Sequence, residues 1–133
     1  MLHAGVSELE RAFRTPLAES LTPPSRHLLL FYAVECGLKA ALLRRKKFRT
    51  TAQFDQGRNP RHDLMLLAKD LRLPATTIGK PVRFQLRRDN TSHEVKYAHQ
   101  AWRYGVALRA TDEDAVVSWL MQLFEWAKGE LQG

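Results

Sequence analysis

Apolar residues fill most positions of one segment, which runs from Ser25 to Arg45 without a proline. They occupy most sides of a helix of about 3.6 residues per turn, a pattern that is typical of a helix surrounded by others. Glu35 and Lys39 interrupt the segment, and their spacing lets them pair on one helix face. Gly37 lies between them and lets another helix approach closely, because it has no side chain. The pattern therefore predicts a central, largely buried helix.

Helical spacing of apolar residues also appears before this segment and near the end of the chain. Ser7-Glu8-Leu9-Glu10 matches a capping box, so a first helix is expected to begin at the serine. Pro23-Pro24 should end that helix, since proline has no amide hydrogen and clashes inside a helix. Thr111-Asp112-Glu113-Asp114 indicates the start of a last helix, and a wide apolar stripe follows it from Val116 to Leu131.

Two shorter helices are predicted in the middle of the chain. Asn59-Pro60 offers an N-cap followed by proline at the first helical position, so a helix should start near Arg61 and stop at Leu73-Pro74. The spacing of apolar residues over 92–104 predicts another helix, which Gly105 would end.

The stretch near 74–91 does not continue the helical pattern. Gly79 and Pro81 break it, and apolar residues then alternate with polar ones, which indicates a short strand or an irregular excursion. A chain of 133 residues is long enough for one core and too short for two stable ones. We therefore predict a single domain over 1–133 with an all-α fold, an antiparallel bundle of four to five helices with an irregular or short β excursion.

The chain is basic, with 21 lysines and arginines against 14 acidic residues and a formal charge of +7. Such an excess favours polyanionic partners, of which nucleic acid is the first to consider. Five cations are concentrated in the run Arg44-Arg45-Lys46-Lys47-Phe48-Arg49 at the end of the predicted central helix. Because cations also stabilise a helix C-terminus, the run has a structural explanation beside a phosphate-binding one.

Cys36 is the only cysteine, which rules out an intrachain disulfide and a thiolate zinc site and is expected of a reducing compartment. Neither a signal peptide nor a membrane-spanning run is recognisable, so we expect a cytoplasmic protein.

The sequence contains no Gly-rich phosphate loop, no His-Glu-x-x-His pair and no nucleophile elbow. It therefore lacks the residues for P-loop nucleotide hydrolysis, zinc proteolysis and serine hydrolysis.

Three motifs, in their order along the chain, resemble the HEPN family, whose name refers to nucleotide binding. They are Val34-Glu35-Cys36-Gly37-Leu38-Lys39, Arg61-His62-Asp63-Leu64 and Trp102-Arg103-Tyr104-Gly105. The resemblance covers the chain from about Thr22 onward. It implies an antiparallel helical bundle that commonly dimerises and that takes RNA or a nucleotide as its ligand. No cofactor and no metal are expected.

Many HEPN domains are metal-independent ribonucleases with the motif Arg-x(4–6)-His, and Arg88-Asp89-Asn90-Thr91-Ser92-His93 has this spacing. The resemblance thus implies that Arg88 and His93 are catalytic. Cleavage within RNA requires the 2′-hydroxyl to lose a proton, which an imidazole accepts, while a guanidinium stabilises charge on the phosphoryl oxygens. Alternatively, the match arises by chance in an arginine-rich chain, and His93 faces solvent.

Other basic and aromatic residues are candidates for contacts with phosphates. His62 is expected at a helix start that presents free amides, although a hydrogen bond to a neighbouring carbonyl would also explain it. Arg103 either points into a cleft or forms a buried ion pair with Glu35. Trp102 is assigned to the core or a dimer interface, and Trp126 is the expected interface anchor. The residues predicted to contact nucleic acid are Arg44, Arg45, Lys46, Lys47, Arg49, Arg58, Arg61, His62, Arg87, Arg103 and Tyr104.

Together these patterns predict an RNA- or nucleotide-binding domain. If Arg88 and His93 are active, it is a metal-independent endoribonuclease of a bacterial toxin or phage-defence system. The expected partners are RNA or a nucleotide, a second copy of the chain in a homodimer, and a partner protein encoded nearby, but no membrane. The alternative is a non-catalytic helical adaptor that binds a partner protein or nucleic acid.

Overall fold

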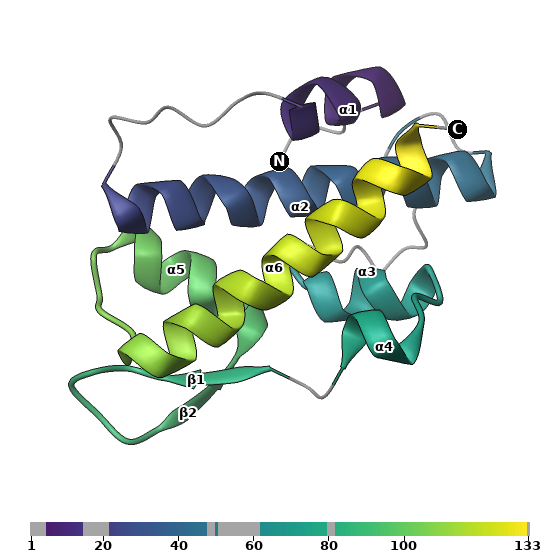
Figure 1. The fold of residues 1–133 in the computed structure, drawn as a ribbon. Coiled ribbons are helices and arrows are strands. Elements are labelled where there is room, and N and C mark those ends of the chain that lie inside the picture. The colour runs from purple at the N-terminus through teal and green to yellow at the C-terminus, as the bar shows by residue number, and fades with distance from the viewer. Residues whose placement is uncertain (1–4, 15–21, 48–49, 51–61, 80–81, 133) are drawn as a thin grey trace.

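The 24-residue helix α2 (Pro23–Lys46) is the element on which most of the other helices pack. α1 (Val6–Arg14) lies along one side of it, and α6 (Ala110–Leu131) crosses it obliquely (Figure 1). The computed structural model describes residues 5–14, 22–47, 50, 62–79 and 82–132. Over these residues the fold is mostly helical with one small antiparallel sheet, which confirms the predicted helical class in its coarse features.

Two short helices lie toward the C-terminal end of α2. α3 (Leu64–Asp70) packs on α2, and the single turn α4 (Ala75–Ile78) packs on α6 (Figure 1). Along the chain, these two helices lie between the central helix and the hairpin.

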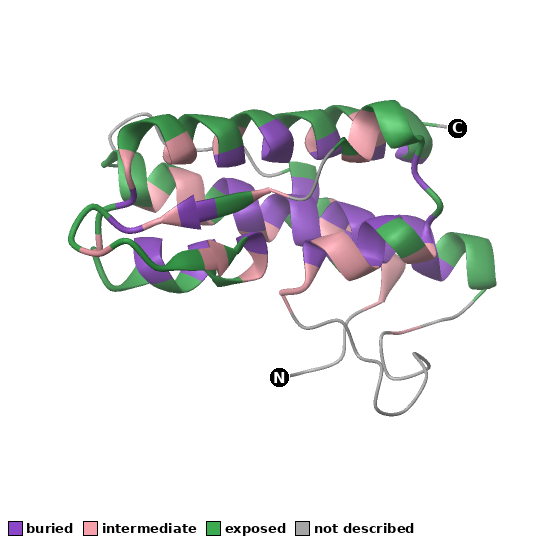
Figure 2. Ribbon diagram, turned by 90° about the horizontal axis from the view of Figure 1, so that it is seen from below, coloured by how far each residue is buried: buried purple, intermediate pink, exposed green. Residues whose placement is uncertain are grey.

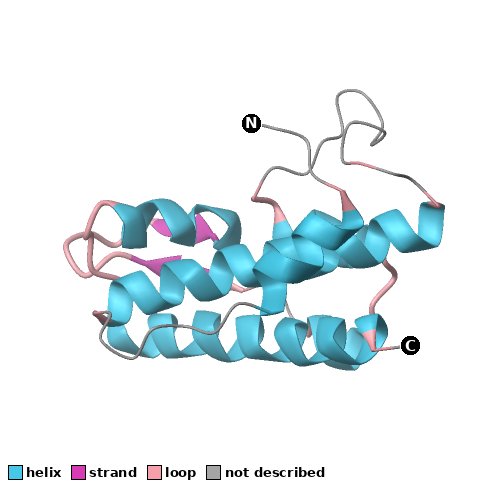
Figure 3. Ribbon diagram, turned by 90° about the horizontal axis from the view of Figure 1, so that it is seen from above, coloured by secondary structure: helices cyan, strands magenta, loops and turns pink. Residues whose placement is uncertain are grey.

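A hairpin occupies the opposite end, near the start of α2. β1 (Arg83–Gln85) pairs with β2 (Ser92–Glu94), and this is the short β excursion predicted near 74–91. The 3₁₀ turn η2 (Val95–Tyr97) follows, and α5 (Ala98–Arg103) returns the chain to α2 (Figures 1 and 3). The hairpin and α5 thus lie together at one end of the long helices.

The predicted central and last helices are confirmed, with shifted starts. α2 begins at Pro23, two residues before the predicted Ser25, because proline fits the first helical turn, where no amide hydrogen is needed. Pro23 and Pro24 therefore start this helix. The predicted capping box is wrong, since α1 begins at Val6 and Ser7 lies inside its first turn.

The start of α3 also differs from the prediction. The helix begins at Leu64, not near Arg61, because Asp63 caps it by accepting a hydrogen bond from the backbone N–H of Leu66 at 3.1 Å. His62 consequently precedes the helix. The predicted cap at Asn59-Pro60 lies outside the described residues.

The helix predicted over 92–104 is wrong in its first half. It forms only from Ala98, because the preceding residues pair with β1 or form the tighter turn η2. Its predicted end is confirmed, since Gly105 has φ 69° and the N–H of Val106 donates to the carbonyl of Ala101 at 2.8 Å. This is the usual arrangement at a helix end with a left-handed glycine.

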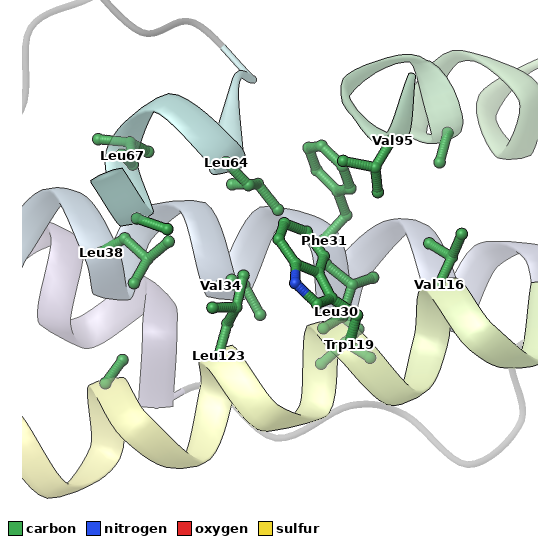
Figure 4. Packing of buried hydrophobic residues seen from close by; sticks show 14 of the residues in the cluster. Leu30, Phe31, Val34, Leu38, Leu64, Leu67, Val95, Val116, Trp119 and Leu123 are labelled. Atoms are coloured by element: carbon green, nitrogen blue, oxygen red, sulfur yellow. The ribbon is translucent and has the colours of Figure 1, made fainter. Parts of the chain in front are cut away.

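The core lies between α2 and α6, and α3 and η2 close it on one side (Figure 4). α2 contributes Phe31, Val34 and Leu38, and α6 contributes Val116 and Leu123, all fully buried. Figure 2 shows exposed residues along the outer face of α6, whereas the exposed residues of α2 lie toward its two ends. Full burial of such a side chain contributes about 1.5–3 kcal/mol, so this cluster provides much of the force that holds the helices together.

Trp102 and Trp119 are buried, which places Trp102 in the core, one of the two alternatives predicted for it. Trp119 also donates its ring N–H to the carbonyl of Ile78 at 3.0 Å and so ties α6 to α4. Trp126 is half-buried, with the guanidinium of Arg45 5.5 Å from its ring centroid. Its role as an interface anchor stays a prediction.

Gly37 is a point of close approach to α2, as its lack of a side chain predicts. A Cβ there would lie 2.6 Å from the Phe13 ring and 3.1 Å from the Cβ of Ala127. We expect Gly37→Ala to lower the free energy of unfolding by about 1–3 kcal/mol through overpacking. Gly129→Ala is the matched control, because its Cβ meets nothing within 4 Å, and it should add roughly 0.5–1 kcal/mol. If urea denaturation shows the same rise in the free energy of unfolding for both variants, the close approach at Gly37 is contradicted.

Candidate active site

A buried ion pair lies in the middle of α2. Glu35 and Lys39 are 6% and 2% exposed, and Oε2 of Glu35 lies 2.8 Å from Nζ of Lys39, which confirms the predicted pairing. Burial by itself would raise the pKa of Glu35, but the charge and hydrogen bond of Lys39, together with His62, hold that pKa below its usual value. Glu35 is therefore a carboxylate inside the bundle that can accept further hydrogen bonds.

His62 supplies those hydrogen bonds. Its backbone N–H donates to Oε2 of Glu35 at 3.0 Å, and its ring Nδ1 lies 3.0 Å from Oε1. A carboxylate only accepts hydrogen bonds, so Nδ1 carries the hydrogen and Nε2 is left for another group. The backbone of His62 is left-handed, with φ 57°, a conformation that persists only where contacts hold it. Glu35 provides this hold, while 35% of the His62 side chain stays exposed.

His99 of α5 packs against the ring of His62. The two ring centroids are 4.3 Å apart, and Phe31 packs on His99 at 5.1 Å. Nδ1 of His99 lies 2.6 Å from the backbone carbonyl oxygen of Lys96, so this nitrogen also carries the hydrogen. Burial, and next the neighbouring His62, lower the pKa of His99 below its ordinary value. A neutral ring therefore supports His62.

Arg103 and Tyr32 continue the group toward the surface. The guanidinium of Arg103 donates to the Tyr32 hydroxyl, and its carbon lies 5.8 Å from the Tyr32 ring centroid. The Tyr32 ring is in turn 5.8 Å from the ring of His62. Arg103 is exposed, so the alternative of a buried Arg103–Glu35 ion pair is wrong. Lys39 occupies that position because it lies one helical turn from Glu35.

These side chains form what we call the His62 cluster: Tyr32, Glu35, Lys39, His62, His99 and Arg103. They come from α2, from the residue before the α3 cap and from α5, which meet beside the central helix (Figure 1). An imidazole of fixed tautomer beside a guanidinium and a phenol can move a proton and stabilise negative charge. Tyr32 and His99 are not among the residues predicted to be functional, although His99 and Arg103 have the spacing of residues on one helix face.

The pair predicted to be catalytic, Arg88 and His93, lies instead at the hairpin. Both line a cavity of about 290 Å³ between the hairpin and α5. His93 stands opposite Phe84 in the β1–β2 register and stacks on its ring, with centroids 5.4 Å apart. Its Nε2 is buried without a hydrogen-bond partner among the described residues. A ribose hydroxyl cannot reach this buried Nε2, whereas 35% of the His62 side chain is exposed.

Part of the basic run is engaged in ion pairs within the molecule. Arg44 pairs with Glu10 of α1, and Arg45 pairs with Glu130 of α6 at 2.9 Å. These contacts support the structural explanation for the first two cations of the run. The other described residues predicted to contact nucleic acid outside the His62 cluster are exposed: Lys46, Lys47, Arg87 and Tyr104. The remaining ones lie outside the described residues: Arg49, Arg58 and Arg61.

Acid should weaken the fold through His99. Because folding lowers the pKa of His99, its contribution to stability is complete above the ordinary pKa of 6.5 and is lost as the pH falls from there through the folded-state pKa. We expect the free energy of unfolding to fall between about pH 7.5 and about pH 5.5, and to fall less in His99→Gln. Urea denaturation at both pH values measures this, and an equal fall in the two proteins would contradict a neutral His99.

Within the described ranges, no three His, Cys, Asp or Glu side chains gather as a set of metal ligands. The described helices also include none with the length and apolar character needed to cross a bilayer. A scan against protein-family models, a search of curated proteins and a search of solved structures gave no match for the chain.

Proposed function

We propose that the chain is a HEPN-like RNA-binding domain that cleaves RNA without a metal ion, with His62 as the group that moves the proton. The observation that supports this proposal is the contact of Glu35 with both the backbone N–H and the ring Nδ1 of His62. This contact holds the ring in place and selects its tautomer. The result is an Nε2 that can accept a proton on a partly exposed side chain. Its ring lies 5.8 Å from the ring of Tyr32, whose hydroxyl accepts a hydrogen bond from the exposed Arg103.

The groups of the His62 cluster take separate roles in this reaction. Nε2 of His62 accepts the proton of a ribose 2′-hydroxyl, whose oxygen attacks the adjacent phosphorus. The bond from phosphorus to the 5′-oxygen breaks, and that oxygen receives the proton back from His62, which leaves a 2′,3′-cyclic phosphate and a 5′-hydroxyl. Arg103 and the Tyr32 hydroxyl stabilise the negative charge on the phosphoryl oxygens. Glu35 is a positioning residue that also stabilises the transient imidazolium.

Incubation of the purified protein with labelled total RNA in EDTA tests the proposal. We expect fragments that end in a 2′,3′-cyclic phosphate, and their loss when His62 is replaced. RNA that stays intact both with and without EDTA would defeat the enzymatic assignment, and cleavage that occurs only without EDTA would contradict the metal-independent mechanism.

The Glu35–Lys39 pair favours a second function, a non-catalytic adaptor. Lys39 already neutralises the charge of Glu35, so the carboxylate needs no substrate group as a partner. This is the arrangement of a purely structural ion pair. An adaptor that binds RNA would show an affinity that falls steeply with salt and would cause no cleavage. The same incubation, combined with a binding titration at two salt concentrations, separates the two functions.

A further inference from the structure

The cavity between the hairpin and α5 has an apolar floor and a polar, aromatic rim. Phe84 and Leu86 are buried in its floor. The rim carries four partly or fully exposed side chains: Arg88, Tyr97, Gln100 and Tyr104. We propose that this cavity binds a single base of the RNA strand whose phosphodiester lies at the His62 cluster. The inference rests on the proposed function and adds to it the way in which the substrate is held.

The size of the cavity suits one base. Its volume of about 290 Å³ lies at the lower end of the roughly 300–1,000 Å³ that is usual for small-molecule pockets. A helix or a folded peptide needs a longer groove, whereas a single base is a flat, compact ligand. Gln100 and Arg88 at the rim supply hydrogen bonds for the edge of the base, and the floor accepts its apolar face.

Tyr104 is the clearest sign of a stacking surface. It lies at the rim of the cavity and is 74% exposed. A ring that stays in water adds no burial energy to the fold. The turn through Gly105 that ends α5 holds it there. Tyr97, which is 44% exposed, lines the same cavity. Exposed aromatic rings beside cations are the common means of binding single-stranded nucleic acid, because every base has a face that stacks.

α5 connects the cavity to the His62 cluster. Successive residues of a helix turn by about 100° and rise by about 1.5 Å. Tyr104 directly follows α5, and its N–H donates to the carbonyl of Gln100 at 3.1 Å, so these two residues lie on one side, which lines the cavity. His99 and Arg103 lie on the adjoining side, which belongs to the cluster. Base and phosphate are likewise joined through a single ribose. A base in the cavity thus places its phosphodiester beside Arg103.

Nucleotide binding tests the proposal apart from cleavage. The probes are AMP, GMP, CMP and UMP, with ribose 5-phosphate as the ligand that lacks a base, each titrated calorimetrically into the protein at low salt. We expect at least one nucleotide to bind tenfold or more tightly than ribose 5-phosphate. Tyr104→Ala should weaken that binding roughly 5- to 150-fold, which corresponds to the stacking of one base. Tyr104→Phe keeps the ring and should bind as the wild type does.

Met121→Ala is the control for trimming an exposed apolar side chain, since Met121 lies on α6 outside this cavity. It should leave nucleotide affinity unchanged. Equal affinities for ribose 5-phosphate and the nucleotides, or an unchanged affinity in Tyr104→Ala, would overturn the inference. It also fails if His93→Ala abolishes cleavage without changing nucleotide affinity, because the hairpin cavity would then be the catalytic site.

The two proposals fail separately. His62→Gly should still bind a nucleotide more tightly than ribose 5-phosphate, because the cavity that holds the base is intact, and it should cleave RNA about 10²- to 10⁴-fold more slowly. Base-dependent binding by a wild-type protein that never cleaves RNA supports the cavity assignment and defeats the proposed reaction. If the protein cleaves RNA but binds ribose 5-phosphate and nucleotides with equal affinity, the proposed reaction is supported and the cavity assignment fails.

Discussion

Replacing Glu35 with glutamine should lower the free energy of unfolding by about 3–5 kcal/mol, the usual loss when one partner of a buried ion pair is removed. Lys39 is 2% exposed and lies 2.8 Å from the carboxylate, so the variant leaves an ammonium group in the bundle without a counter-charge. The glutamine also lacks one of the two acceptor oxygens that hold His62. Urea denaturation followed by circular dichroism measures the loss.

Two further variants show whether the loss comes from the unpaired charge. Adding Lys39→Met to Glu35→Gln should recover most of the stability, because it removes the ammonium group and keeps a carbonyl acceptor for His62. Glu130→Gln is the matched surface control, since Glu130 pairs with Arg45 at 2.9 Å and a surface pair contributes about 0.2–1 kcal/mol. A further loss on adding Lys39→Met would mean that the two side chains stabilise the fold independently.

Replacing His62 with glycine should reduce the rate of RNA cleavage about 10²- to 10⁴-fold while the protein stays folded. Glycine adopts the left-handed backbone of this position without strain, and it keeps the N–H that donates to Glu35. The variant therefore removes the imidazole and little else. Imidazole added to the buffer should restore part of the activity, because it can occupy the space beside Glu35 and take over the proton transfer.

The rescue distinguishes chemistry from folding. His27→Ala serves as the control. His27 is also a half-buried histidine, but it lies on α2, packs on Trp102 and is outside the His62 cluster. The variant should keep the wild-type cleavage rate. Full activity in His62→Gly would contradict the proposed role. If instead His93→Ala loses RNA cleavage, the reaction takes place at the hairpin, as the spacing of Arg88 and His93 predicts.

Much of the fold could be predicted because its largest elements are periodic. The central helix, the pairing of Glu35 with Lys39 and the close approach at Gly37 all follow from residues within a few turns of one helix. The strand Ser92–Glu94 could not be predicted, since it contains no apolar residue and directly precedes residues with helical spacing. It becomes a strand because its backbone pairs with Arg83–Gln85, and only the packed hairpin creates that pairing.

Residue types and local spacing by themselves determined a basic, mostly helical chain with one long apolar helix, and they indicated His62 and Arg103 as candidates for function. Tertiary structure decided that Glu35 holds His62, that His99 lies against it, and that Arg103 reaches Tyr32. These groups come from segments far apart along the chain. Their distances and accessibility depend on how the helices pack, and a periodic pattern records only which face of each helix is buried.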